Sequence, residues 1–217
     1  MEFQHELIIP DEGFPFKVFL FEGGNGNYVR EKHWHTSIEI FAVLAGSLDF
    51  FVNKEEYPLK AGEQIIINSN EIHSIHAPEK NQTVVLQIPL KQFENYFTAQ
   101  RFIRFRGQEE TTDKKLTSLI KKLYKTYVDR ETGYEFKTMS IFYEIMYILI
   151  RDYRVTEAKE KEIRHSHRLD VLSKITTYMR EHYKEDLKLS ELAATFGYSD
   201  AYLSRMFQKY AKINYKT

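Results

Sequence analysis

Residues 38–53, IEIFAVLAGSLDFFVN, predict two β-strands joined by a tight turn. β-Branched and aromatic residues dominate 38–44 and 47–53, and Ala45-Gly46 supplies the turn between them. Similar short apolar runs extend outward in both directions, at 16–22, 63–68, 72–76 and 82–89. Many short strands with no helix between them are typical of a β-sandwich or a closed β-barrel.

From about Thr111 the apolar residues take the spacing of helices. Five of them share one helical face: Leu116, Leu119, Ile120, Leu123 and Tyr127. The next stretch, about 135–154, is apolar on more than one side and must therefore be buried on most of them. We expect the preceding helix, the barrel and a second copy of the chain to cover it, with Ile145 and Leu149 in a homodimer interface.

The composition excludes several classes of protein. The 217 residues contain no cysteine, so disulfide scaffolds, Cys-ligated zinc, iron–sulfur clusters and thiol nucleophiles are excluded. The longest apolar stretch, 141–150, is interrupted by Glu144 and is half the length of a membrane span. The N-terminus MEFQHELIIP lacks the features of a signal peptide, and we expect a cytoplasmic protein without membrane contact.

Charge is distributed unevenly along a chain whose formal net charge is zero. Residues 1–110 carry 10 basic and 16 acidic side chains, a net charge of −6. The net charge is +2 over 111–162, from 11 basic and 9 acidic residues, and +4 over 163–217, from 10 basic and 6 acidic residues. The basic C-terminal segment is the part expected to meet a polyanion.

A charged stretch with few apolar residues, 155–168, is predicted to be a linker, and the segment 187–210 that follows, LKLSELAATFGYSDAYLSRMFQKY, has the pattern of a helix-turn-helix. Ser190 and Ser199 are predicted to cap its two helices, and Gly197 supplies a turn residue with positive φ. The shared core is predicted to comprise Leu192, Phe196, Leu203 and Phe207.

This core leaves a short, polar and basic face on the second helix, as a helix in the DNA major groove requires. The face comprises Ala201, Tyr202, Ser204, Arg205, Gln208 and Lys209. The alternative is an ordinary helical hairpin whose outer face is solvated.

Residues 169–217 resemble the start of the DNA-binding region of AraC-type transcription regulators, through L-S-E-L-A, G-Y-S and Y-L-S-R-M-F. The resemblance implies double-stranded DNA as partner, with base contacts from Ala201, Ser204 and Arg205 and phosphate contacts from Gln208 and Lys209. Lys212 stands where the family usually has glycine. The family has two helix-turn-helix units and this chain holds residues of the first, so we expect an incomplete DNA-binding region with weak affinity.

Three histidines and a glutamate form a second constellation in the β-rich half. His33 and His35 lie two apart and point to the same side of a strand, while Glu39 and His73 arrive from other segments. Such a set could hold Zn, Fe, Mn or Ni, could contact an effector without a metal, or could be structural. No cofactor is otherwise indicated.

Residues flanking this set are interpreted differently. Trp34 points to the opposite side of the strand and is predicted to pack rather than line a pocket. His5 and His76 have no convergent setting and are interpreted as surface histidines.

The spacing H-x-H-x3-E-x6-G from His33 to Gly46 resembles the first motif of cupins. The stretch from Gly62 to His73 is weakly similar to the second motif, with Asn68 and Asn70 in place of the usual proline and glycine. AraC-type regulators carry cupin-like sensor barrels at their N-terminus, so both resemblances imply one architecture.

The expected fold is α+β with two domains. It consists of a cupin-like β-barrel, a double-stranded β-helix, over 1–110, dimerisation helices over 111–154, the linker 155–168 and an all-α helix-turn-helix over 169–217. The implied function is an effector-responsive transcription regulator that is not an enzyme, with a carbohydrate as first candidate for the effector. The alternatives are a metal-dependent cupin enzyme, either an isomerase or a dioxygenase, and a non-catalytic ligand-binding module.

Overall fold

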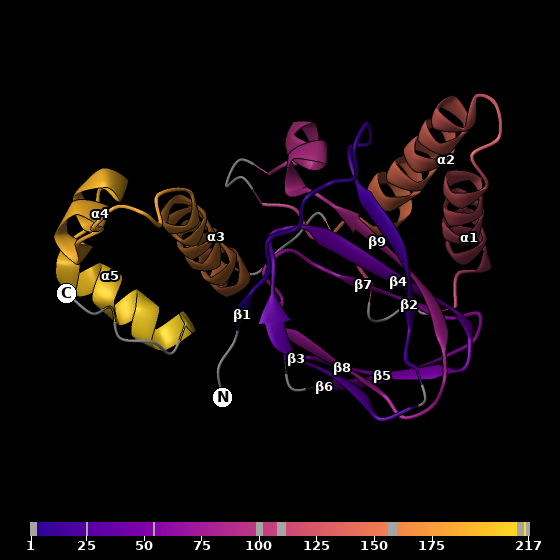
Figure 1. The fold of residues 1–217 in the computed structure, drawn as a ribbon, viewed down its shortest axis with the longest axis horizontal. Coiled ribbons are helices and arrows are strands. Elements are labelled where there is room, and N and C mark those ends of the chain that lie inside the picture. Colours follow the sequence, from indigo (N-terminus) through magenta and orange to yellow (C-terminus); the bar gives the residue numbers. More distant parts are fainter. Residues whose placement is uncertain are drawn as a thin grey trace.

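The computed structural model describes residues 4–24, 26–53, 55–98, 102–107, 112–155, 160–211 and 215. Within these residues two β-sheets face each other, with helices on two sides of them (Figure 1). One sheet has the order β1 (Gln4–His5), β3 (Tyr28–Trp34), β8 (His73–Ala77), β5 (Ser47–Val52) and β6 (Glu55–Lys60). The other has the order β2 (Lys17–Glu22), β9 (Gln82–Ile88), β4 (Ile38–Ala45) and β7 (Gln64–Ile67).

Neighbouring strands pair antiparallel, except that β1 pairs parallel with β3. The predicted strand pair 38–53 is present as β4 and β5, and Gly46 between them has a φ of +75°. A Cβ at this position would lie 2.3 Å from the carbonyl oxygen of Lys80, so the turn requires glycine. The predicted runs leave out β1, β3 and β6, and β6 lies at the edge of its sheet, where Pro58 is tolerated.

Alternate residues of β4 enter two different hydrophobic clusters. Phe41 and Val43 point between the two sheets, whereas Ile38, Ile40 and Ala42 point to the helices that cover the second sheet. A strand buried on both faces carries no polar alternation, which explains why Glu39 is its one polar residue.

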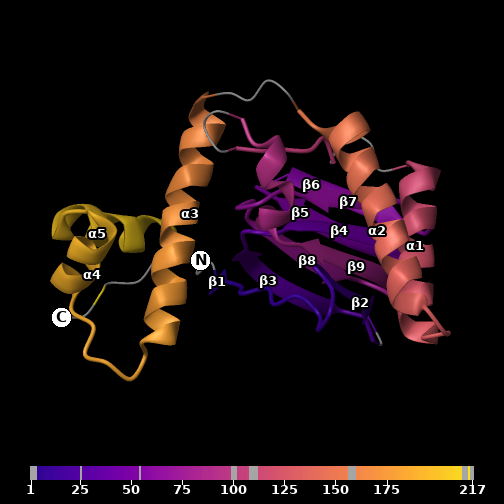
Figure 2. The same ribbon diagram turned by 90° about the horizontal axis from the view of Figure 1, so that it is seen from above.

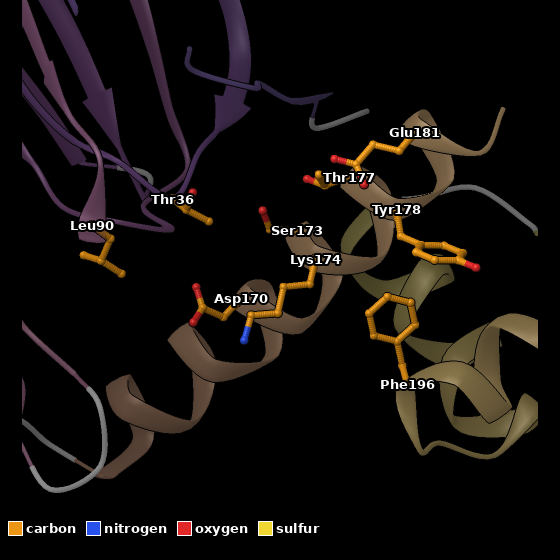
Figure 3. Close-up of a pocket in the computed structure, with 9 residues that line it drawn as sticks. All are labelled: Thr36, Leu90, Asp170, Ser173, Lys174, Thr177, Tyr178, Glu181 and Phe196. Atoms are coloured by element: carbon orange, nitrogen blue, oxygen red, sulfur yellow. The ribbon is translucent and has the colours of Figure 1, made fainter. Parts of the chain in front are cut away.

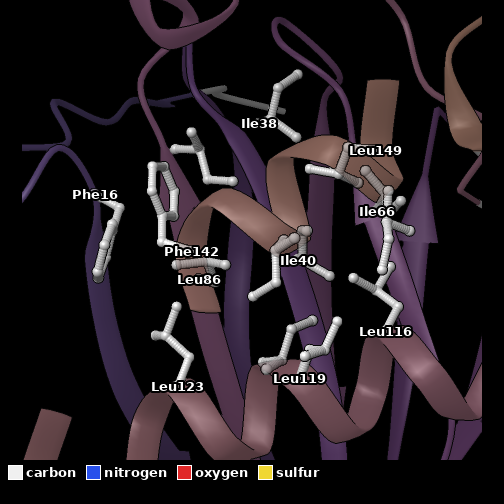
Figure 4. Packing of buried hydrophobic residues seen from close by; sticks show 14 of the residues in the cluster. Phe16, Ile38, Ile40, Ile66, Leu86, Leu116, Leu119, Leu123, Phe142 and Leu149 are labelled. Carbon is white, nitrogen blue, oxygen red and sulfur yellow. The ribbon is translucent and has the colours of Figure 1, made fainter. Parts of the chain in front are cut away.

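The helices α1 (Lys114–Asp129) and α2 (Tyr134–Ile148) pack on the outer face of the four-stranded sheet (Figures 2 and 4). Asp113 caps α1 by accepting from two backbone amides, and α2 continues as a π-helical turn over Leu149–Tyr153. Ile145 and Leu149 are fully buried against the sheet, so their assignment to a dimer interface is wrong. The outward side of α2 instead presents Phe136, Tyr143 and Tyr147, which are 84%, 62% and 57% exposed.

The C-terminal helices lie on the opposite side of the sheets from α1 and α2, with α3 (Glu160–Glu181) next to the sheets (Figure 2). The linker predicted over 155–168 is therefore helical from Glu160 onward, and residues 156–159 lie outside the described residues. Two shorter helices follow, α4 (Leu189–Phe196) and α5 (Asp200–Met206), and α5 continues as a π-helical turn over Phe207–Ala211. Among the described residues, no helix is both long enough and apolar enough to cross a membrane.

Candidate functional site

The four predicted residues meet at one end of the space between the sheets. His33 is next to the last residue of β3 and pairs with His73 at the start of β8, while Glu39 lies on β4 opposite Gln87. The exposed fractions are 5% for His33, 1% for His35, 3% for Glu39 and 0% for His73. Convergence is thus as expected from the sequence, and we name these four residues the histidine cluster.

Each ring of the histidine cluster is oriented by a backbone carbonyl. The Nδ1 atoms of His33, His35 and His73 lie 2.8, 3.0 and 3.0 Å from the carbonyl oxygens of Glu31, Ser37 and Glu71, respectively. A carbonyl can only accept, so each Nδ1 carries the proton that it donates. One ring nitrogen from each histidine lies within 4.8 Å of the other two.

Glu39 supplies negative charge to the histidine cluster. Its Oε2 lies 2.9 Å from His35 Nε2 and 3.3 Å from His73 Nε2, and its Oε1 accepts from Gln87 Nε2 at 2.7 Å. Burial opposes ionisation of Glu39, but the adjacent His35, followed by His73, outweighs it and holds the pKa of Glu39 well below its usual range. Burial opposes protonation of His35 as well, but Glu39 outweighs it and raises the pKa of His35. The pair is therefore an imidazolium and a carboxylate.

His33 differs from His35 in its charge state. Burial, followed by repulsion from His73, lowers the pKa of His33 to about 3, so its ring is neutral near pH 7. With the proton fixed on Nδ1, its Nε2 presents a lone pair. The Nε2 atom of His73 is buried and makes no hydrogen bond among the described residues, although Glu39 lies 3.3 Å away.

This donor set suits a divalent metal ion. Neutral imidazoles oriented by carbonyls through Nδ1 are the usual arrangement of histidine ligands, and an unbonded buried nitrogen is what an ion would satisfy. His33, His35 and His73, with Glu39, are the residues that would hold it. An ion there would supply positive charge in place of the proton on His35.

The N-terminal strand crosses the mouth of the histidine cluster. Glu6 follows β1, and its Oε2 lies 3.4 Å from His33 Nε2 and 3.1 Å from the guanidinium of Arg30. Glu6 is absent from the sequence-based site. A single carboxylate in a terminal segment carries no spacing signal, and its role depends on the parallel pairing of β1 with β3.

His5 connects this strand to α3 and is not the surface residue expected from the sequence. Its two ring nitrogens lie 3.0 Å from Ser173 Oγ and 3.1 Å from Thr176 Oγ1, and its ring centroid lies 4.4 Å from that of Trp34. Burial, followed by the charge of Arg180, lowers the pKa of His5 to about 4.

Trp34 packs as predicted, and the surface that it packs on is the C-terminal helical unit. It is 1% exposed and belongs to the cluster that forms the core of that unit: Leu169, Leu172, Ile175, Leu189, Leu192, Ala193, Leu203, Met206 and Phe207. Ile72, which precedes His73, packs against the same core. Three residues of the histidine cluster, His33, His35 and His73, thus have sequence neighbours in the contact with α3.

A pocket of about 520 Å³ lies in the same contact (Figure 3). Thr36, between β3 and β4, and Leu90, just after β9, line one side of it. The other side comes from α3 and α4: Asp170, Ser173, Lys174, Thr177, Tyr178, Glu181 and Phe196. Phe196 was predicted to be core, but it is half-buried and packs edge-on against Tyr178. The Asn70 amide donates to Asp170 at 3.4 Å beside this pocket.

The predicted polar face lies on α5 and the turn that extends it. Ala201, Arg205, Gln208 and Lys209 are exposed, and Tyr202 and Ser204 are half-buried. Ser199 caps α5 by accepting from the backbone amide of Tyr202, and Gly197 has a φ of +73°, both as predicted. The N-cap position of α4 is occupied by Lys188, whose side chain makes no capping hydrogen bond, and the predicted cap Ser190 lies inside the helix.

Comparisons with known proteins found one family model and several relatives. A family model described as the AraC-like ligand binding domain matches residues 15–146. An uncharacterized HTH-type transcriptional regulator of Staphylococcus aureus strain COL is 21% identical over 174 residues, which are 79% of this chain and 23% of the relative. Another, from strain MSSA476, is 20% identical over 168 residues, 76% of this chain and 22% of the relative. The chain thus spans less than a quarter of the length of these relatives.

Solved structures also show similarity. A cupin superfamily protein of Desulfitobacterium hafniense has a TM-score of 0.33 and 11% sequence identity, covering 35% of this chain and 68% of that one. A conserved protein of unknown function from Streptococcus pyogenes has a TM-score of 0.34 and 15% identity, covering 40% and 80%.

Proposed function

Because the chain belongs to the AraC-like ligand-binding-domain family, we propose that it is a transcription regulator that binds double-stranded DNA in response to a small-molecule effector. The names of its curated relatives support the regulator class. One observation carries the proposal. His33 and His35 belong to the histidine cluster, while Trp34 between them enters the core of the helical unit that bears the α5 face.

The α5 face supports DNA as the partner. Ser199 caps α5, and the exposed residues of this face are Ala201, Arg205, Gln208 and Lys209. The exposed side chain near the start of the helix is small, and two of those that follow are basic. In this proposal Ala201, Ser204 and Arg205 meet base edges, and Gln208 and Lys209 meet phosphates. Beside these residues the ring of Tyr202 stacks on the ring of Tyr198, with 5.0 Å between the ring centroids.

The coupling of effector to DNA is proposed to run through α3. Its inner side meets Trp34, Ile72 and His5, all of which adjoin the histidine cluster or the strand that crosses it. A ligand that rearranges the cluster therefore shifts these three contacts, because packed side chains repack in discrete steps. The position of α3 then changes, and α5 is carried with it through their shared core.

The pocket between the sheets and α3 is the proposed effector site. Its hydroxyl, carboxylate and ammonium groups can hydrogen-bond to a polar molecule, and the rings of Tyr178 and Phe196 offer apolar faces. These features keep a carbohydrate as the first candidate. Thr36, which lines this pocket, directly follows His35 in the sequence. A bound molecule would therefore touch both α3 and a residue next to the histidine cluster.

We propose no catalytic role for the histidine cluster. A catalytic metal site needs a position open to substrate. All four residues are at most 5% exposed, and Glu6 lies against His33 at the mouth. This burial favours sensing over the enzyme alternative.

DNA binding by side chains of α5 is the direct test. A preferred duplex is selected from a random-sequence library, and binding is followed by fluorescence anisotropy. Arg205→Ala should cost about 1–3 kcal/mol on the selected duplex and relax its sequence preference. Lys209→Ala should weaken binding to all duplexes alike, and it should lower the slope of log affinity against log salt concentration by about one. Lys121→Ala, an exposed change on α1, is the matched control, and equal binding by all four proteins would contradict the proposal.

A further inference from the structure

A second, smaller pocket of about 200 Å³ lies between α3 and α5, and we name it the α3–α5 cleft. It is lined by Arg168 of α3 and by Tyr202, Arg205, Met206 and Lys209. Three of the five lining residues are cationic and none is acidic. Arg168 belongs to the stretch predicted to be a linker, so the sequence did not connect it with the α5 face.

We propose that Arg168 is a phosphate contact that α3 adds to the α5 face, with a backbone phosphate of the bound duplex seated in the α3–α5 cleft. The inference rests on the proposed DNA-binding function and deepens it. Arg168, Arg205 and Lys209 bring two guanidinium groups and an ammonium group to one small space, all of which can donate hydrogen bonds to a phosphate. Guanidinium groups bind phosphate oxygens in pairs, which a compact phosphate in this space allows.

The distribution of charge on α3 supports a specific orientation. Asp170, Lys174 and Glu181 line the pocket toward the sheets, whereas Arg168 lines the cleft toward α5. The basic residue thus lies on the side of α3 that continues the α5 face. A helix in the major groove has phosphates along both walls, and a cation beside that helix is placed to meet one of them.

The contact would also tie DNA to the position of α3. Leu169, the next residue, is 1% exposed and lies in the core that contains Trp34. Arg168 would therefore contact the duplex, while its neighbour Leu169 contacts the core that contains Trp34. A shift of α3 on the sheets would change the phosphate contact directly.

The test compares Arg168→Ala with Arg164→Ala in the 217-residue chain. Arg164 lies one turn earlier on α3, is 65% exposed and lies outside the cleft, paired with Glu160 at 3.3 Å. Binding to a labelled random-sequence duplex is measured by anisotropy between 50 and 200 mM salt. Arg168→Ala should weaken binding up to about eightfold at 100 mM salt and lower the salt slope by about one, because each phosphate contributes about 0.9. Arg164→Ala should leave the slope unchanged.

Two results would overturn the inference, and they are distinguishable. If the unaltered chain binds DNA with a salt-dependent affinity and both variants keep its slope, the phosphate contact is wrong and the proposed function stands. If the unaltered chain shows no binding at 50 mM salt, both the proposed function and the contact are wrong. Arg168→Lys, which keeps one positive charge, should recover most of the slope but less of the affinity.

Discussion

At position 39 a single carboxylate balances the charge of the histidine cluster. Glu39 bonds to His35 and to Gln87 and lies 3.3 Å from His73, in a site from which water is excluded. A buried ion pair is costly to break by removing one partner, because the remaining charge loses its compensation. The electrostatic balance of the cluster therefore rests on this residue.

Glu39→Ala should lower the free energy of unfolding of the metal-free chain at pH 7 by about 3–5 kcal/mol, because buried His35 would lose the partner that stabilises its proton and Gln87 would lose its acceptor. Urea unfolding in the presence of a chelator measures the change. The control is Glu63→Ala, which removes a carboxylate that accepts from the Lys60 amide at an exposed turn and should cost less than about 1 kcal/mol. Similar small losses for both variants would argue against a buried imidazolium–carboxylate pair.

His5 should make unfolding pH-dependent. Its pKa in the folded chain is about 4 and its ordinary value is 6.5, so below pH 6.5 the unfolded chain binds a proton that the folded chain does not. Stability is therefore lost as pH falls from about 6.5 to 4. Because the ring is half-exposed, solvent screening makes the loss smaller than the full pKa shift would give. We expect the free energy of unfolding to fall by about 1–2 kcal/mol.

The measurement is the urea midpoint at pH 7 and pH 5 for the unaltered chain, His5→Gln and His76→Gln. His5→Gln should flatten the pH dependence, and His76→Gln, a change at a half-exposed histidine near Asp49, measures the effect of replacing a histidine elsewhere in the sheets. An identical pH dependence in His5→Gln would show that His5 does not link the N-terminal strand to α3.

Among the elements, those with a buried face could be predicted from the sequence. The apolar strand β4, the helices α1 and α2 and the caps of α5 follow from local patterns of residues such as Ile40, Leu119 and Ser199. The first nine residues of α3 were predicted as linker because charged residues dominate them. The Arg164–Glu160 pair shows how such residues support a helix without an apolar stripe.

The site was predictable only in part for a related reason. His33, His35, Glu39 and His73 carry a spacing, and their convergence needs only strand alternation. Glu6, His5 and the pocket at Thr36 depend on which strand pairs with β1 and where α3 packs, neither of which is encoded locally. Gln87, a polar residue directly after the apolar run 84–86 of β9, was a signal that the sequence did offer.

The outer side of α2 is where we propose that two copies of the chain meet. Phe136, Tyr143 and Tyr147 are exposed at intervals of seven and four residues, which places them on one stripe. Phe136→Glu with Tyr147→Glu should convert dimers to folded monomers in sedimentation experiments at micromolar concentration. Ile145→Glu, at a fully buried position, should instead unfold the chain. A monomeric unaltered chain would contradict the proposal.

For the whole molecule, the α3 contact joins two modules of different charge and composition. The sheets bring the histidine cluster, the N-terminal strand and Thr36 to one side, and α3 meets that side while sharing a core with α4 and α5. Coupling between two sites is reciprocal in free energy. If occupancy near the cluster changes DNA affinity through α3, DNA binding must in turn change the contact of α3 with the sheets.

Trp34 reports on that contact directly, because it is the only tryptophan of the chain and lies in the core shared with α3. The decisive measurement is its fluorescence emission during a titration with duplex DNA, alongside the anisotropy of the labelled duplex. We predict that emission changes and saturates with the same midpoint as the anisotropy, and that Arg205→Ala shifts both midpoints together. An anisotropy transition without any change in Trp34 emission would show that the two modules act independently and would contradict the proposed coupling.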